Sequence, residues 1–126
     1  MTNSKQKGKR GELELCRVLE RVLKGTSWRR SQQFCGVAGD ADCIGVDGLH
    51  VECKRVEGGT KTVYKWLEQA VSDAKNTDIP IVCHRPNGQD WIGIVYLEDL
   101  EGLYNVLRGV YEEEKRDTTK ADKRSG

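Results

Sequence analysis

The chain has 126 residues, of which 37% are hydrophobic and 33% are charged, and this predicts one domain with a single modest core. Its 21 Lys and Arg residues nearly balance its 20 Asp and Glu residues, so the overall charge points to no class of partner. The apolar runs are far shorter than the roughly 20 residues that cross a bilayer. These features exclude a membrane protein and a disordered chain.

Five cysteines are scattered through the sequence, and none belongs to a Cys-x-x-Cys motif. Their odd number argues against a disulfide framework, so we expect a reducing, cytoplasmic setting. The residues from which a zinc site could draw are Cys35, Cys43, His50 and Cys53. Because His50 and Cys53 are three apart on an expected strand, they point to opposite faces, and zinc is disfavoured.

Hydrophobic periodicity predicts three helices and five strands. The first helical repeat begins at Leu13 and is stopped by Gly25. The pair Asp47-Gly48 is a strong hairpin turn signal, and Thr62 fits the N-cap of a second amphipathic helix. In chain order the expected elements are a helix over 9–24, a strand over 28–34, a glycine-bearing loop over 35–39, strands over 43–46 and 49–54, a helix over 63–74, strands over 79–84 and 91–96, and a helix over 97–110.

This order of elements predicts an α/β fold, with a mixed sheet of about five strands and helices packed on its faces. We expect residues 1–8 to form a basic N-terminal arm and residues 9–112 to form the single domain. Residues 113–126 contain almost nothing apolar and many charges of both signs, which is typical of a disordered tail.

The strongest chemical signal lies in the expected hairpin. Glu52 and Lys54 are two apart on its second strand and share a face, while Cys53 turns to the other face. Asp42 begins the preceding strand, so pairing across the turn brings its carboxylate near that of Glu52. Two carboxylates so close repel each other, and a hard divalent ion such as Mg²⁺ relieves this.

The same residues have a plainer interpretation. Asp42 can be a solvated turn residue, with Glu52 and Lys54 forming an exposed pair. Asp40 competes for the role of Asp42, which we prefer because it directly precedes the apolar strand. Glu12, near the start of the first helix, borders the face that packs on the sheet, or it is simply a favourable acid in the first helical turn.

With these residues laid out, the sequence resembles the PD-(D/E)XK nuclease superfamily, and within it the archaeal Holliday junction resolvases and the small phage proteins related to them. The resemblance covers roughly residues 7–96. It is carried by the Lys7-Gly8-x-x-x-Glu12 helix start, Asp42 before an apolar pair, Glu52-Cys53-Lys54, the later Gln69 and the strand pair at 79–84 and 91–96.

The resemblance implies a restriction-endonuclease-like fold and a divalent metal, Mg²⁺ with Mn²⁺ able to substitute. Asp42 and Glu52 would bind it, together with the backbone carbonyl of Cys53, and Glu12 would complete the acidic shell. The sequence departs from the motif in having Ala41, not Pro, before Asp42.

The resemblance also implies that Lys54 is the catalytic lysine and that Gln69 reaches the site from the second helix. Members of the resolvase branch act as homodimers on four-way DNA junctions. The leucine-rich face of the third helix is a candidate subunit interface, although packing against the core explains it equally well. The resemblance suggests a phage, prophage or archaeal source.

A nearly neutral chain must bind DNA through local basic patches, which make affinity strongly salt-dependent. The alternative is that these residues only keep the surface soluble. The candidate DNA-binding residues are Lys7, Lys9, Arg10, Arg29, Arg30, Arg55, Lys61 and Lys65.

The sequence therefore favours a Mg²⁺-dependent DNA endonuclease, with Holliday junctions as the first choice of substrate. One alternative keeps the same site in a phage-type nickase, flap nuclease or end-trimming nuclease. The other is a catalytically silent DNA-binding protein on the same fold.

Overall fold

The computed structural model describes residues 4–31, 41–58, 61–75 and 77–124 of the chain. Its elements, in order, are α1 (Ser4–Val22), β1 (Arg29–Arg30), β2 (Cys43–Ile44), β3 (Leu49–Lys54), α2 (Val63–Asp73), β4 (Ile79–His84), β5 (Ile92–Ile94), a short 3-10 helix η2 (Leu97–Asp99) and α3 (Leu100–Arg124). The predicted α/β fold with a five-stranded mixed sheet is confirmed.

The strands follow one another across the sheet in the order β1-β2-β3-β4-β5. Only β3 and β4 pair in parallel, and α2 provides the crossover connection between them. The predicted hairpin joins β2 to β3, with Cys43 opposite Val51. Its turn needs a glycine, because Gly48 has a φ of +96° and its Cα faces the side chain of Val106.

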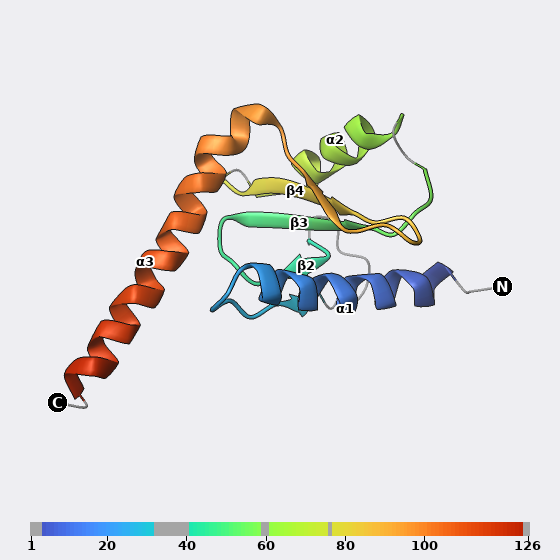
Figure 1. Ribbon diagram of the computed structural model, residues 1–126. Coiled ribbons are helices and arrows are strands. Elements are labelled where there is room, and N and C mark those ends of the chain that lie inside the picture. The colour runs from blue at the N-terminus through green and yellow to red at the C-terminus, as the bar shows by residue number, and fades with distance from the viewer. Residues whose placement is uncertain (1–3, 32–40, 59–60, 76, 125–126) are drawn as a thin grey trace.

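The helices α1 and α2 cover opposite faces of the sheet (Figure 1). On the α1 face, Leu15 packs with Val51 and Cys43 in the main core, where each is at most 1% exposed. On the α2 face, Leu67 and Ala70 pack on Val82. Because side chains alternate along β3, every second residue of that strand faces α2.

The first and last helices are longer than expected. α1 starts at Ser4, so most of the expected basic arm over 1–8 is helical, and α3 continues through most of the expected disordered tail over 113–126. The first extension contains Lys and Gln and the second is rich in Glu, Lys and Arg, all of which are good helix formers. Charge pairs one turn apart also support α3, as Arg108 and Glu112 show at 2.9 Å.

The remaining differences concern strand ends. β1, β2 and β5 are each shorter than the expected strands over 28–34, 43–46 and 91–96. The end of the first of these strands and the glycine-bearing loop over 35–39 lie outside the described residues. No helix in the part of the chain that the structure describes is long and apolar enough to cross a membrane.

Candidate functional site

Asp42 is held in place by its neighbours on both sides. Its backbone oxygen accepts a hydrogen bond from the N–H of Ser31 at 3.0 Å, and its own N–H donates to Val51 O at 3.0 Å. The carboxylate oxygen Oδ2 accepts from the N–H of Cys53 at 2.8 Å. The side chain is therefore anchored against β3 and not free in a turn.

The structure brings Asp42 and Glu52 together. Cys43 lies opposite Val51 in an antiparallel register, so Asp42 lies opposite Glu52 on the same face. Burial raises the pKa of Asp42 to about 7, and the hydrogen bond and charge of the Glu52 carboxyl group add to the rise. The N–H of Cys53 acts in the opposite direction. The Glu52 carboxyl group therefore makes ionisation of Asp42 less favourable. This is the repulsion between neighbouring carboxylates that the sequence predicts for a cation site.

His50 is the residue at this site that the sequence analysis missed. It lies on β3 two residues before Glu52, on the same face, and its Nε2 is 2.7 Å from Glu52 Oε1. The imidazole is 3% exposed. Burial lowers the pKa of His50, but the hydrogen bond and charge of Glu52, with the charges of Asp73 and Asp78, outweigh it and the net pKa is raised. The two-residue period of the strand, which places residues 50 and 52 on one face, could have predicted this contact from the sequence.

Lys54 ends β3, two residues beyond Glu52, and is half-buried on the same face. Its backbone oxygen accepts from the N–H of Arg85 at 3.0 Å, which fixes the strand end. The side chain of Lys54 has no hydrogen bond or ion pair to another residue of the described ranges. Its ammonium is therefore available to a bound molecule.

Glu12 does not join the pair in the way that the resemblance implies. Its Oε2 accepts a hydrogen bond from Arg30 Nε at 2.8 Å, and this ion pair bridges α1 and β1. The charge of Glu12 still contributes to the raised pKa of Asp42. Within the ranges that the structure describes, no cluster of three or more His, Cys, Asp or Glu side chains is arranged to hold a metal.

Gln69 also differs from its predicted place. It is exposed on α2, and its Nε2 donates to Asp73 Oδ2 at 3.1 Å on the same helix. The α2 residues buried against the sheet are instead Leu67 and Ala70. The helix rotation that buries these two turns Gln69 toward solvent, and the described residues show no contact between Gln69 and either carboxylate.

Two of the predicted DNA-binding arginines have partners within the protein. Arg30 pairs with Glu12, and Arg55 donates to Arg85 O and, at 2.9 Å, to Asn87 Oδ1. The stem of Arg55 also packs so closely on α1 that no Cβ would fit at Gly11. Arg55 therefore ties α1 to the turn between β4 and β5.

The other predicted basic residues remain at the surface. Those with exposed side chains are Lys9, Arg10, Arg29, Lys61 and Lys65, whereas the side chain of Lys7 and all of Asp40 lie outside the described residues. Lys9 and Arg10 immediately precede Gly11, which packs on Arg55 beside Lys54. Lys9 and Arg10 therefore lie near this end of β3, on the helix that covers the opposite face of the sheet from the carboxylates.

The donor chemistry of this site fits a hard divalent cation. Asp42 and Glu52 supply carboxylate oxygens, and a cation between them would replace the proton that the raised pKa of Asp42 retains. Burial and next the charge of Asp42 raise the pKa of the Cys53 thiol, which lies on the other face. Any contribution of Cys53 is therefore expected from its backbone carbonyl.

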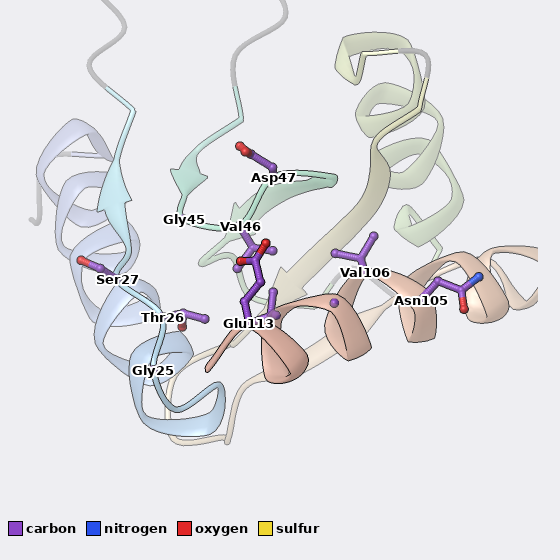
Figure 2. Close-up of a pocket in the computed structure, with 11 residues that line it drawn as sticks. Gly25, Thr26, Ser27, Gly45, Val46, Asp47, Asn105, Val106 and Glu113 are labelled. Atoms are coloured by element: carbon purple, nitrogen blue, oxygen red, sulfur yellow. The ribbon is translucent and has the colours of Figure 1, made fainter. Parts of the chain in front are cut away.

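A separate pocket of about 520 Å³ lies at the turn end of the hairpin. It is lined by the loop after α1, by residues of the β2–β3 turn and by α3 (Figure 2). Lys54 lies at the opposite end of β3 from this turn. The pocket is thus distinct from the carboxylate site.

Comparison with known proteins agrees with the fold. A family model described as "Phage putative PDDEXK endonuclease" matches residues 3–124, nearly the whole chain. No curated protein and no solved structure matches the chain significantly. The five-stranded mixed sheet flanked by helices is the restriction-endonuclease-like arrangement expected of such a family. The chain therefore belongs to the phage PDDEXK endonuclease family, within the PD-(D/E)XK nuclease superfamily.

Proposed function

We propose that the protein is a Mg²⁺-dependent DNA endonuclease whose active site is formed by Asp42, Glu52 and Lys54. Membership of a nuclease family implies DNA as the substrate class, and PD-(D/E)XK nucleases generally depend on a divalent metal. The observation that carries the proposal is the pair of facing carboxyl groups of Asp42 and Glu52 on neighbouring strands, in which the pKa of Asp42 is raised to about 7.

In this proposal Asp42 and Glu52 hold Mg²⁺, together with the backbone carbonyl of Cys53. Bound Mg²⁺ would acidify a water and polarise the scissile phosphodiester. The N–H of Cys53, which donates to Asp42 Oδ2 at 2.8 Å, keeps that carboxylate oriented. Glu12 has a more distant role, because it is paired with Arg30 and acts on Asp42 through its charge.

Lys54 supplies a positive charge next to the carboxylates. Its ammonium group would orient the attacking water or stabilise the charge that develops on the phosphate. The exposed Lys9 and Arg10 at the same end of the molecule would bind the flanking DNA backbone through phosphate contacts. Arg30 and Arg55 do not belong to this set, because their guanidinium groups bind within the protein.

Four-way junctions are the substrate that we propose first. The motif order resembles the junction-resolving branch of the superfamily, and the net charge of +1 argues against strong non-specific binding to any duplex. A nickase, flap nuclease or end-trimming nuclease would use the same residues, and so the substrate comparison decides between them.

The experiment incubates the purified protein with an immobile four-way junction and with a linear duplex of matched sequence. Each is tested with Mg²⁺, with Mn²⁺ and with EDTA, and the variant E52Q is run alongside. Paired symmetric nicks in the junction alone, lost with EDTA and in the variant, support a resolvase. Equal cutting of both substrates supports a nuclease without junction preference. Metal-dependent cutting of neither, with DNA binding intact, supports the silent binding protein.

We also propose that the protein acts as a homodimer. Symmetric cutting of two strands needs two sites, and the described chain holds one carboxylate pair. Support comes from α3, where Tyr104 is 61% exposed and Leu100 47% exposed, beside a groove of about 470 Å³ that Leu107 and Tyr111 help to line. Light scattering after size exclusion would give twice the 14.2 kDa chain mass, and Y104E would halve it.

A further inference from the structure

We propose that His50 is a positioning residue of the candidate active site, which holds one carboxylate oxygen of Glu52 and so sets the orientation in which Glu52 meets a divalent cation. The inference rests on the proposed function, because it takes Glu52 as a metal ligand. It adds a residue that neither the motif order nor the family resemblance includes.

The contact is short and shielded from water. His50 Nε2 lies 2.7 Å from Glu52 Oε1, and the two side chains are 4% and 12% exposed. A hydrogen bond from a ring N–H to a carboxylate is charge-assisted, and its strength increases where the surroundings exclude water. His50 therefore fixes Glu52 Oε1 through one of its lone pairs, and the rest of the carboxylate can still accept a cation.

The position of His50 follows from the strand. Residues 50 and 52 are successive side chains on one face of β3, and Pro80 is the register partner of His50 on β4. Next to Glu52 across the hairpin lies the carboxyl group of Asp42, which repels it when both are ionised. The donor on His50 offsets this repulsion and holds the Glu52 side chain in one orientation.

Groups that hold metal-binding side chains are a general feature of metal sites. Ligating carboxylates are themselves hydrogen-bonded, and loss of such a partner lowers metal affinity by about 10- to 100-fold. A merely structural histidine would instead affect folding and leave metal binding unchanged. The two possibilities are separable because the protein contains a second buried histidine on the same face, which contacts Val56 and Trp66.

That second histidine is His84. It lies on the same face, on the neighbouring strand in register with Lys54, and is 8% exposed. Its Nε2 lies 3.0 Å from Val56 O, and its ring packs on Trp66 with 4.9 Å between centroids. Substitutions at His84 therefore report the cost of altering a buried histidine on this sheet without touching the Glu52 carboxylate.

The test uses two amides at position 50 that differ by one methylene. In H50Q the side-chain amide nitrogen occupies the place of Nε2 and can still donate to Glu52. In H50N the amide is too short to reach Glu52, yet it keeps a polar group of similar size. H84Q and H84N are the matched controls, and urea unfolding shows that each variant is folded before it is tested.

The readouts are the affinity for Mn²⁺, by calorimetry without DNA, and the Mg²⁺ concentration that gives half-maximal cleavage. We expect H50N to weaken Mn²⁺ binding and to raise the half-maximal Mg²⁺ concentration by about 10- to 100-fold, and H50Q to restore both to within a few-fold. Both H84 variants should bind Mn²⁺ like the wild type, whatever their stability.

Three outcomes overturn the proposal, and only the last also overturns the proposed function. If the wild type binds Mn²⁺ and cleaves DNA but H50N does both equally well, His50 has no positioning role and the proposed function stands. The same holds if H50Q and H50N are equally impaired in parallel with the H84 variants. If the wild type binds no Mn²⁺ and E52Q changes nothing, the proposed function fails and His50 has no ligand to position.

Discussion

Asp42 and Glu52 lie opposite each other across the antiparallel β2–β3 hairpin, Glu52 buried and Asp42 half-buried, and burial together with the Glu52 carboxyl group raises the pKa of Asp42. Two acids in this arrangement cannot both ionise without cost. The pair therefore links the stability of the fold to pH and to divalent cations, and this link can be measured.

The first prediction concerns stability against pH in metal-free protein. The pKa of Asp42 is about 7 in the folded protein against 3.8 for an ordinary Asp, so the unfolded chain loses this proton first. Stability contributed by the bound proton is present at low pH and is lost as pH rises through about 7. The raised pKa of His50 acts in the same direction. Urea midpoints should fall from pH 5 to pH 8.

Mg²⁺ should reduce this fall, because a cation binds the ionised pair and stabilises the folded state most at high pH. D42N provides the control, since it removes the titrating group and should flatten the profile between pH 5 and 7. A metal-free midpoint that rises across this range in the wild type would contradict the prediction.

The second prediction concerns Lys54. K54M keeps a side chain of similar length without the charge, so the fold and Mn²⁺ binding should remain. Cleavage should fall by about 10²- to 10³-fold, the usual cost of one electrostatic group at a transition state. Single-turnover cleavage with saturating Mg²⁺ measures this, and K24M, at an exposed lysine outside the predicted DNA-binding set, is the control. Equal cleavage rates for the two variants would show that Lys54 has no catalytic role.

The third prediction concerns Arg55, which links Arg85 and Asn87 to α1. R55A removes two hydrogen bonds and the packing on Gly11, and should lower the free energy of unfolding by about 2 to 3 kcal/mol. R55K should not restore it, because lysine lacks the forked donors that reach two partners. Chemical denaturation measures both variants.

Arg55 should contribute little to DNA binding directly. The salt dependence of DNA affinity should therefore keep its slope in R55A and become shallower in the double variant K9A/R10A, which removes exposed cations. If the slope became shallower in R55A and stayed unchanged in K9A/R10A, Arg55 would be a DNA-binding residue and the prediction would be wrong.

The fourth prediction concerns two glycines of α1. No Cβ fits at Gly11 against Arg55, whereas nothing lies within 4 Å of the Cβ position at Gly8. G11A should destabilise the protein by about 1 to 3 kcal/mol through overpacking. G8A should stabilise it by up to about 1 kcal/mol, because alanine is the better helix former. Thermal unfolding of the two variants measures the contrast.

The G11A cost should shrink when Arg55 is also replaced by alanine, since the two residues then no longer collide. A double-mutant cycle on G11A and R55A therefore checks the contact itself. Additive effects would show that α1 does not pack on Arg55 in solution.

The sequence by itself determined those features of the fold that depend on neighbouring residues or on a strict repeat. Asp47-Gly48 specifies the hairpin turn, and the two-residue period places Glu52 and Lys54 on one face. Together they bring Asp42 near Glu52, because antiparallel pairing leaves little freedom once the turn is known. The strand over 79–84 and the start of the second helix were likewise predictable from the apolar pattern.

Tertiary packing decided which long side chains find partners. From the sequence, Arg30 and Arg55 were predicted to be available to DNA. In the fold, Glu12 of α1 binds Arg30, and Asn87 of the β4–β5 turn binds Arg55. The rotation of α2 that buries Leu67 leaves Gln69 in solvent. Sequence spacing cannot predict such contacts, because they depend on where two distant elements meet and not on the period of either one.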